Sequence, residues 1–167
     1  GPGGLTVWLV ERPELPIVSA SFILPYGSAN DPEEAPGTMA LLADMLDEGA
    51  GPRDALQVSE TIGSLGATLS LSTGADASTA EVLSLRDKFD TTFEVLCDVV
   101  ARPHLSEADF RRTKKIWKNA LKKRSDDPGA VASVVTSAIL YGSKTPYGHP
   151  ALGLYSKADK VTLPGIT

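Results

Sequence analysis

Two histidines, one cysteine and a short acidic run are the side chains with the clearest potential for chemistry. The histidines are His104 and His149, and the cysteine is Cys97. A cysteine nucleophile needs a base beside it, and no recognisable motif joins Cys97 to either histidine. Tight zinc sites take three or four protein ligands, for which this set is a poor source. We therefore interpret Cys97 as a buried small apolar side chain, and we place both histidines in loops.

The acidic run consists of Asp44, Asp47 and Glu48. It lies near the C-terminal end of an expected helix, where negative charge opposes the helix dipole. We interpret the run as a solvated acidic face. The opposed dipole is an argument for the alternative, a basic partner, for which Arg53 and Arg86 are the candidates.

A hydrolase site of another kind is a further hypothesis. Its candidates lie on an expected hairpin, and they are Ser72, Thr73, Asp76 and Glu81. Such a site needs a nucleophile beside a base, and no such pair stands out from the sequence.

Composition and charge limit the function classes. The 167 residues carry a formal net charge of −5, which argues against a partner such as nucleic acid or an anionic membrane. A basic stretch over 111–124 is explained by a solvated helix face. No run of 18 apolar residues predicts a membrane span. We expect a single domain over 1–167. The loop-like end at 162–167 suggests a fragment of a longer chain.

The first part of the chain predicts two strands and a helix. Strands are expected over 5–11 and 17–24, the second covered on both faces, with a turn at 12–16 where two prolines break regular pairing. A helix is expected over about 35–48. Its apolar residues recur at helical spacing and face a core, and they are Leu41, Leu42, Met45 and Leu46.

The rest of the chain alternates hairpin and helices. A helix is expected over 54–64, a hairpin of strands over 67–73 and 78–85, and helices over 87–101, 106–125 and 128–140. Each of the last two helices is expected to turn four apolar residues toward the core. For the helix over 106–125 they are Phe110, Ile116, Trp117 and Leu121, and for the helix over 128–140 they are Val131, Val134, Val135 and Leu140. The order predicts an α+β fold, an antiparallel or mixed sheet with helices packed on one face.

Six segments in this order resemble one family across nearly the whole chain. The segments are LTVWLVERPELPIV, YGSANDPEEAPGTMALLADMLDEG, IGSLGATLSLSTGADAST, DVVARPHLSEADFRRTKK, DDP and YGHPALGLYS. Together they resemble a homology domain of the pitrilysin/insulinase zinc peptidases, which include the mitochondrial processing peptidase. The resemblance implies a metallohydrolase-like domain, usually present in tandem pairs that close around a peptide chamber.

The resemblance also implies where a zinc site would lie. In the family, two histidines at i and i+4 and a distal glutamate bind zinc, and a glutamate before the second histidine acts as general base. With the register fixed by Gly37 and Gly49, the histidine positions are Ala40 and Asp44, and the base position is Ala43. Counting back from Pro128 places the distal glutamate at Ala120 and a supporting acidic position at Thr113. No position keeps the residue that the family chemistry needs.

From the resemblance we expect a non-catalytic domain without zinc or another cofactor of its own. Zinc would belong to an active peptidase domain or subunit of the same family, which is the expected partner together with extended peptides. The alternative is a free-standing scaffold or interaction protein of the same fold. Bacterial relatives with this degenerate pattern favour a periplasmic or otherwise exported location over a cytoplasmic one, and a single cysteine fits either compartment.

Overall fold

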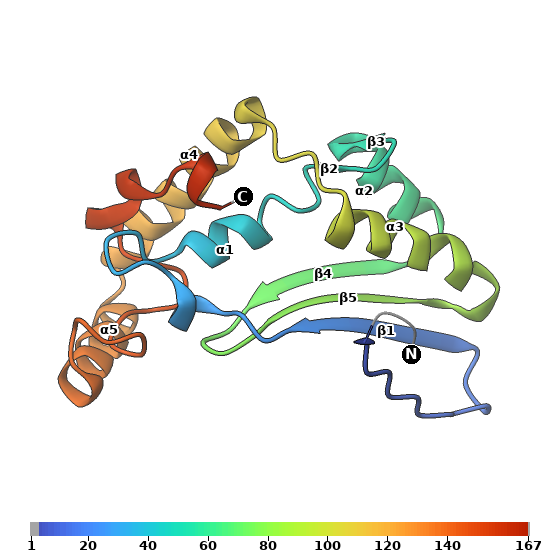
Figure 1. Cartoon of the computed structure of the whole chain (residues 1–167), viewed down its shortest axis with the longest axis horizontal. Coiled ribbons are helices and arrows are strands. Elements are labelled where there is room, and N and C mark those ends of the chain that lie inside the picture. Colours follow the sequence, from blue (N-terminus) through green and yellow to red (C-terminus); the bar gives the residue numbers. More distant parts are fainter. Residues whose placement is uncertain (1–3, 167) are drawn as a thin grey trace.

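The computed structural model describes residues 4–166 and shows a small sheet with helices packed above it (Figure 1). The main sheet has the strand order β1–β5–β4, with β1 at Ile17–Leu24, β4 at Thr68–Thr73 and β5 at Ser78–Leu85. Both strand pairs are antiparallel. A second, two-stranded sheet joins β2 (Gly49–Ala50) to β3 (Arg53–Asp54). The predicted α+β class is confirmed.

Five α-helices and several short 3₁₀ turns complete the described chain. The α-helices are α1 (Thr38–Ala43), α2 (Ala55–Ser64), α3 (Phe89–Ala101), α4 (Glu107–Ser125) and α5 (Pro128–Tyr141). The 3₁₀ turns are η2 (Ser28–Asn30), η3 (Arg86–Lys88), η4 (Tyr155–Lys160) and η5 (Leu163–Gly165). Among the residues that the structure describes, no helix is both long and apolar enough to cross a membrane.

Helix starts follow the side chains that the sequence offers. Asp54 caps α2 by accepting from the Gln57 amide at 2.8 Å, and Gln57 returns a hydrogen bond to the Asp54 amide at 3.0 Å. This reciprocal capping box satisfies two amides that the helix leaves unpaired. Ser106 caps α4 in the same position, and Pro128 lies in the first turn of α5, where its missing N–H costs nothing.

The core lies between the helices and one face of the sheet. One cluster joins α1 to α4 and η4 through Leu41, Met45, Trp117 and Leu121. Two others fill the space between α2, α3 and the sheet, and they contain Val58, Val95, Val99, Val82 and Leu96. The opposite sheet face carries small hydroxyl side chains, among them Ser19, Ser21, Ser70 and Ser72.

The helix expected over 35–48 is shorter than predicted. Regular α-helix ends at Ala43, and the chain continues in tight turns in which Met45 and Glu48 bond to carbonyls three residues earlier. These turns lead into Gly49, whose φ of +133° strongly favours glycine. The sequence could not distinguish these turns from a helix, because Met45 is buried in the core as it would be in a continuing helix.

The strand expected over 5–11 is not formed. Residues 5–11, which we call the N-terminal arm, lie beside β1 without being assigned to a strand (Figure 1). The expected cover of β1 is also wrong, since Ile17, Ile23 and Leu24 are exposed. A strand needs a neighbour to pair with, and β1 pairs only with β5 in the described chain.

Helix α5 does not bury the apolar residues predicted to point inward. None of its side chains is buried, and Val131, Val135 and Leu140 are exposed. Ile116 on α4 is exposed as well, contrary to prediction. The reason is placement, because α5 projects beyond the sheet and contacts chiefly α4 (Figure 1).

Candidate functional site

The start of α1 is held in place by a carboxylate and a close helix contact. Asp31 accepts from the Gly37 amide at 2.6 Å and from the Met39 amide at 2.8 Å. Burial raises the pKa of Asp31, while these amide hydrogen bonds and His149 oppose the rise. Gly37 has a φ of +96°, and a Cβ there would lie 2.6 Å from the Trp117 ring. The glycine thus allows α1 to approach α4 closely.

The three α1 positions that correspond to a zinc motif differ in exposure. Ala40 is 6% exposed and Ala43 is 8% exposed, whereas Asp44 is exposed to water. The Asp44 amide still bonds to the Ala40 carbonyl at 3.1 Å, so the two residues lie one helical turn apart. Two of the three positions are therefore methyl groups within the packed interior.

Helix α4 turns a different set of residues toward α1. Thr113, Trp117 and Leu121 are buried, and Trp117 and Leu121 pack in the cluster of Leu41. Ala120 is exposed. Thr113 donates a hydrogen bond to Glu48 at 3.2 Å, which joins the end of the α1 segment to α4.

The acidic run has a basic partner that the sequence did not indicate. Arg112 on α4 forms an ion pair with Glu48, and it also contacts Asp109 at 3.3 Å. The expected partners are wrong, because Arg53 bonds to residues of α3 and Arg86 to the Leu15 carbonyl. Helix packing sets this pairing, and residues 48 and 112 are far apart in sequence.

Asp44 and Asp47 have no ion pair among the described residues. Burial within dense surroundings raises the pKa of Asp44, and the charges of Asp47 and Glu48 add to the rise. Burial also raises the pKa of Asp47, partly opposed by its own backbone and by Arg112.

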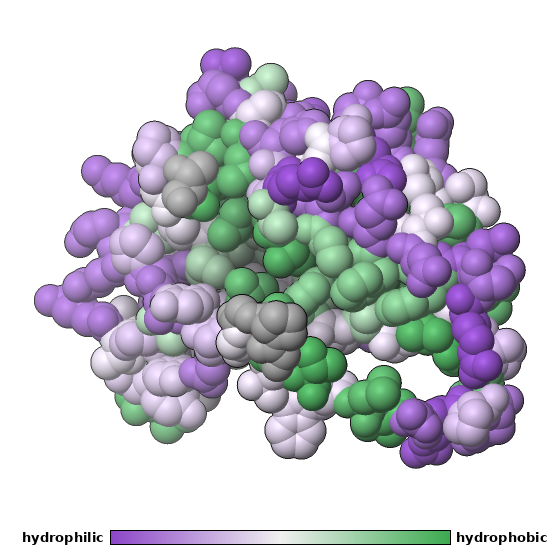
Figure 2. Space-filling view, turned by 45° about the vertical axis from the view of Figure 1, so that its right-hand side comes forward, coloured by the Kyte–Doolittle hydropathy of each residue, from purple (hydrophilic) through white to green (hydrophobic). Residues whose placement is uncertain are grey.

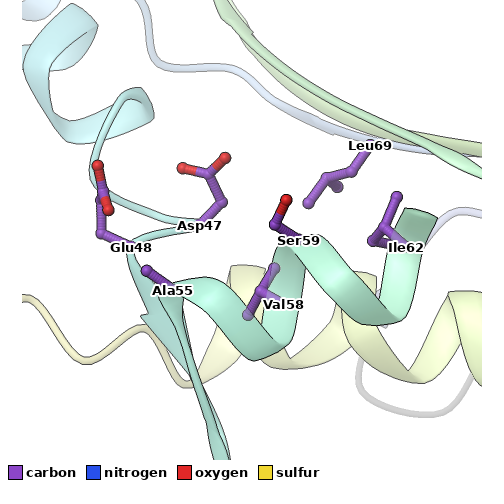
Figure 3. Close-up of a pocket in the computed structure, with 7 residues that line it drawn as sticks. All are labelled: Asp47, Glu48, Ala55, Val58, Ser59, Ile62 and Leu69. Atoms are coloured by element: carbon purple, nitrogen blue, oxygen red, sulfur yellow. The ribbon is translucent and has the colours of Figure 1, made fainter. Parts of the chain in front are cut away.

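A hollow of about 320 Å³ opens beside this acidic run (Figure 3). Asp47 and Glu48 project from the segment after α1, and α2 and β4 complete the wall with Ala55, Val58, Ser59, Ile62 and Leu69. Its polar groups are two carboxylates and one hydroxyl. Within residues 4–166, no group of three or more His, Cys, Asp or Glu side chains is arranged to hold a metal ion.

A buried ion network, which sequence reasoning missed, fixes the β2–β3 hairpin against α3. Asp98 is 2% exposed and accepts from Arg53 at 2.9 Å and from Arg102 Nε at 3.1 Å. Arg53 also contacts Glu94 at 3.3 Å. A Cβ on Gly51 would collide with the Asp98 carboxylate, so the glycine allows the hairpin to approach it. The available signal was an aspartate within the apolar run of a helix, four residues before an arginine.

The remaining candidates are engaged in separate structural contacts. His104 bonds through Nε2 to the Gly51 carbonyl at 2.8 Å, and His149 lies 3.5 Å from the Pro150 carbonyl through Nδ1. Cys97 is half-buried rather than buried as predicted. Burial raises the pKa of its thiol and the charge of Asp98 adds to the rise, which disfavours the nucleophilic thiolate.

The hairpin candidates do not assemble into a nucleophile and a base. Thr73 bonds to the Met39 carbonyl and lies 3.1 Å from Ser78 Oγ, and Glu81 accepts from Ser19 at 2.8 Å. Asp76 accepts from the Tyr147 hydroxyl at 2.6 Å, which raises the pKa of that tyrosine.

Comparison with known proteins assigns this arrangement to a family. Residues 6–149 match the family model described as insulinase, peptidase family M16. The chain belongs to the M16 peptidase family. It is 22% identical over 161 residues to an uncharacterised zinc protease of Mycobacterium leprae.

Solved M16 structures share the fold. The inactive domain of a peptidase M16 from Pseudomonas fluorescens superposes with a TM-score of 0.86 at 27% identity, over 94% of this chain and 38% of that one. A protease from Helicobacter pylori gives a TM-score of 0.82 at 17% identity over 91% and 37% of the two chains, and pitrilysin gives 0.73 at 19% over 88% and 16%. The chain spans 36% of the M. leprae relative, so it corresponds to one part of these longer M16 proteins.

Proposed function

We propose that this chain is a non-catalytic M16 domain that pairs with an active M16 domain or subunit and helps to enclose a peptide chamber. The observation that carries the proposal is the burial of Ala40 and Ala43. By the family resemblance these positions carry the first zinc ligand and the general base, and here they are methyl groups in the α1 interface. On this face of α1, the side chains at the two positions contribute to packing and offer no ligand or base.

The donor set does not fit a zinc ion. Among the five mapped positions, Asp44 has the one carboxylate. Ala40, Ala43 and Ala120 offer no ligand atom, and Thr113 offers a neutral hydroxyl. Structural and catalytic zinc sites use three or four protein ligands.

The kept framework supports a role in assembly. Asp31 fixes the start of α1 through two amides, and Gly37 lets α1 approach Trp117 of α4 closely. A domain that shapes a chamber wall needs such a framework whether or not it binds zinc. The structure described as an inactive M16 domain of P. fluorescens shares this fold over almost the whole chain. Its description applies to that protein, and it makes a non-catalytic M16 domain a known type.

The pairing is tested by mixing the chain with an M16 subunit of the same organism that carries an intact His-x-x-Glu-His motif. We expect a one-to-one complex by size-exclusion chromatography with light scattering, and faster cleavage of a fluorogenic peptide than by the active subunit alone. Asp44→Ala serves as a matched control, because it removes the one potential ligand of the chain and should leave the stimulation intact. A stable complex without stimulation would favour the scaffold alternative, and no complex would contradict the proposal.

A further inference from the structure

The end of α4, the first half of α5 and residues 150–155 enclose an apolar hollow of about 160 Å³. Its lining includes Val131, Val134 and Val135 of α5, together with Leu121 of α4 and Leu154. A cavity of about 150 Å³ is large enough to hold one benzene molecule. The hollow can therefore receive one large apolar side chain from a partner, such as that of leucine or phenylalanine.

An apolar stripe continues from this hollow along α5. Val131, Val135 and Ile139 follow one another at intervals of four residues, and they are 42%, 50% and 77% exposed. Residues four apart lie on one face of a helix, so the stripe is about 12 Å long at about 1.5 Å per residue. Figure 2 shows hydrophobic side chains at the lower left, the end of the molecule at which α5 lies in Figure 1. We call the hollow and the stripe together the α5 groove.

The surface around the α5 groove is basic, although the whole chain carries a net charge of −5. Residues 128–158 contain Lys144 and Lys157 and neither aspartate nor glutamate. Arg124 lines the hollow and is half-buried, and its guanidinium has no ion pair or hydrogen bond among residues 4–166. A half-buried guanidinium has lost part of its hydration, and a charge-assisted hydrogen bond to a carboxylate offsets that loss. The groove therefore favours a partner that brings a carboxylate.

The same charges argue against a second copy of this chain as the partner. In a two-fold pair with antiparallel α5 helices, the start of one α5 lies beside the end of the other. Arg124 would then approach Lys144 of the second copy, and residues 128–158 offer no carboxylate to separate the two cations. Like charges that face each other across an interface disfavour the complex. The charge pattern thus selects a different protein.

A helix is the element that fits this surface best. An amphipathic helix binds in an apolar groove through residues at i, i+3 or i+4, and i+7. The hollow, Val135 and Ile139 offer three contact points at matching intervals along α5. An acidic residue on the flank of the bound helix would then meet Arg124.

We propose that the α5 groove binds an acidic amphipathic helix of another protein. One large apolar side chain enters the hollow, two more pack on the stripe, and a carboxylate pairs with Arg124. The inference goes beyond the proposed function, because α5 contains none of the mapped zinc positions and the binding requires neither zinc nor peptide cleavage.

Binding is measured by the fluorescence anisotropy of a labelled, blocked peptide that is titrated with the 167-residue protein. The peptide is Glu-Glu-Ala-Leu-Glu-Ala-Ala-Leu-Glu-Ala-Leu-Glu-Ala-Ala-Leu-Glu-Glu-Ala, which is long enough to be partly helical in water. We expect saturable binding that weakens as the salt concentration rises, since salt screens the opposite charges. The same peptide with lysine at every glutamate should bind at least about tenfold more weakly.

Two pairs of variants locate the bound peptide. Val135→Asp should weaken binding at least about tenfold, because the peptide would bury the new charge. Its matched control is Ser133→Asp, which lies about 200° around the same helix at an exposed position and should bind as the parent protein does.

The second pair tests the role of the guanidinium. Arg124→Gln should weaken binding of the glutamate peptide and reduce its salt dependence, because the charge in the hollow is lost. Lys123→Gln removes the same charge from an exposed neighbour that does not line the hollow, and it should bind within about twofold of the parent protein.

Several results would overturn the inference. No saturable binding at millimolar concentration, or equal binding of the lysine peptide, would show that the groove does not select an acidic helix. Equal losses in Val135→Asp and Ser133→Asp would place the peptide elsewhere. A dimer that Val135→Asp dissociates would assign the stripe to a second copy, and binding to phosphatidylcholine–phosphatidylserine vesicles that the same variant abolishes would assign it to a membrane. None of these results involves an M16 partner, so failure here is distinguishable from failure of the proposed function.

Discussion

Two regions of the molecule are rich in apolar residues and differ in what surrounds them. One is the block, by which we mean α1, α3 and the core clusters packed against them, and the other is the N-terminal arm. Leu41, Met45 and Leu96 are completely buried in the block, whereas Trp8 is 90% exposed on the arm. The buried Asp98 carboxylate of the block is also paired internally, with two arginines. The block buries its large apolar side chains within this chain, whereas the arm leaves them exposed.

The comparison predicts that the largest effect on stability comes from Asp98. Asp98→Ala leaves Arg53, whose side chain is mostly buried, without its main partner. We expect a loss of about 3 kcal/mol in the free energy of unfolding, at the low end of the range for broken buried pairs because Glu94 remains. Chemical denaturation measures it. Glu94→Ala removes the exposed partner and should cost less than about 1 kcal/mol, and equal effects would contradict the asymmetry.

The next effect concerns the start of α1. Asp31→Ala removes the acceptor for the Gly37 and Met39 amides, so we expect a loss of about 1–2 kcal/mol in the free energy of unfolding, as for other helix caps. Glu33→Ala, on the same loop, is the matched control, since the contact of Glu33 with Lys157 is made by its backbone carbonyl. Chemical denaturation compares the two variants. If Asp31→Ala left the free energy of unfolding unchanged, packing against Trp117 alone would hold the helix.

Asp44 provides a smaller, pH-dependent effect. Its raised pKa means that the folded protein binds the proton more tightly than the unfolded chain, so the stability contributed by this group falls as pH rises through that range. Asp44→Asn should therefore stabilise the protein at neutral pH. Because the side chain is exposed, the gain should stay below about 0.5 kcal/mol. It should vanish near about pH 3, where the aspartate is protonated in both states.

Asp159 gives the control of opposite sign for this titration. Its hydrogen bond with Lys118 lowers the pKa of Asp159, so its contribution is present at neutral pH and lost as pH falls through the folded pKa. Asp159→Asn should lower stability at neutral pH and not at low pH. The difference in the free energy of unfolding between variant and parent protein should change with pH in opposite directions for the two variants. A change in the same direction for both would contradict the account.

The smallest effect is predicted for the arm. Deletion of residues 1–11 should change Tm by less than about 2 °C, because the exposed arm contributes little packing to the isolated chain. Differential scanning calorimetry measures the change, and it should be accompanied by less self-association as exposed apolar surface is removed. A fall in Tm of more than about 5 °C would show that the arm belongs to the block.

The features predicted correctly from the sequence are those that local signals determine. The hairpin around Gly74 and the caps at Asp54 and Ser106 are each specified by residues within a few positions of one another. The features predicted wrongly depend on distant residues. Arg112 pairs with Glu48 only because α4 packs on the α1 segment, and neither α5 nor the arm can bury apolar residues without a neighbour.

The features of the candidate site also divide into those that the sequence predicts and those that depend on distant residues. The sequence alone points to Ala40, Ala43 and Asp44 through the family resemblance, since the spacing of Gly37 and Gly49 defines their register. The burial of Ala40 and Ala43 could not be predicted, because it depends on how closely α1 approaches its neighbours through Gly37. The Asp98 network was likewise hidden, since its arginines come from both a hairpin and the end of α3.

The central claim is that the block has kept the M16 framework without its chemistry. The most direct test is elemental analysis of the purified chain for zinc, with a fluorogenic peptide assay on the same sample before and after a chelator. The account predicts no stoichiometric zinc and no chelator-sensitive cleavage. One zinc per chain together with chelator-sensitive cleavage would contradict it, and would place a working site among residues to which the account gives structural roles.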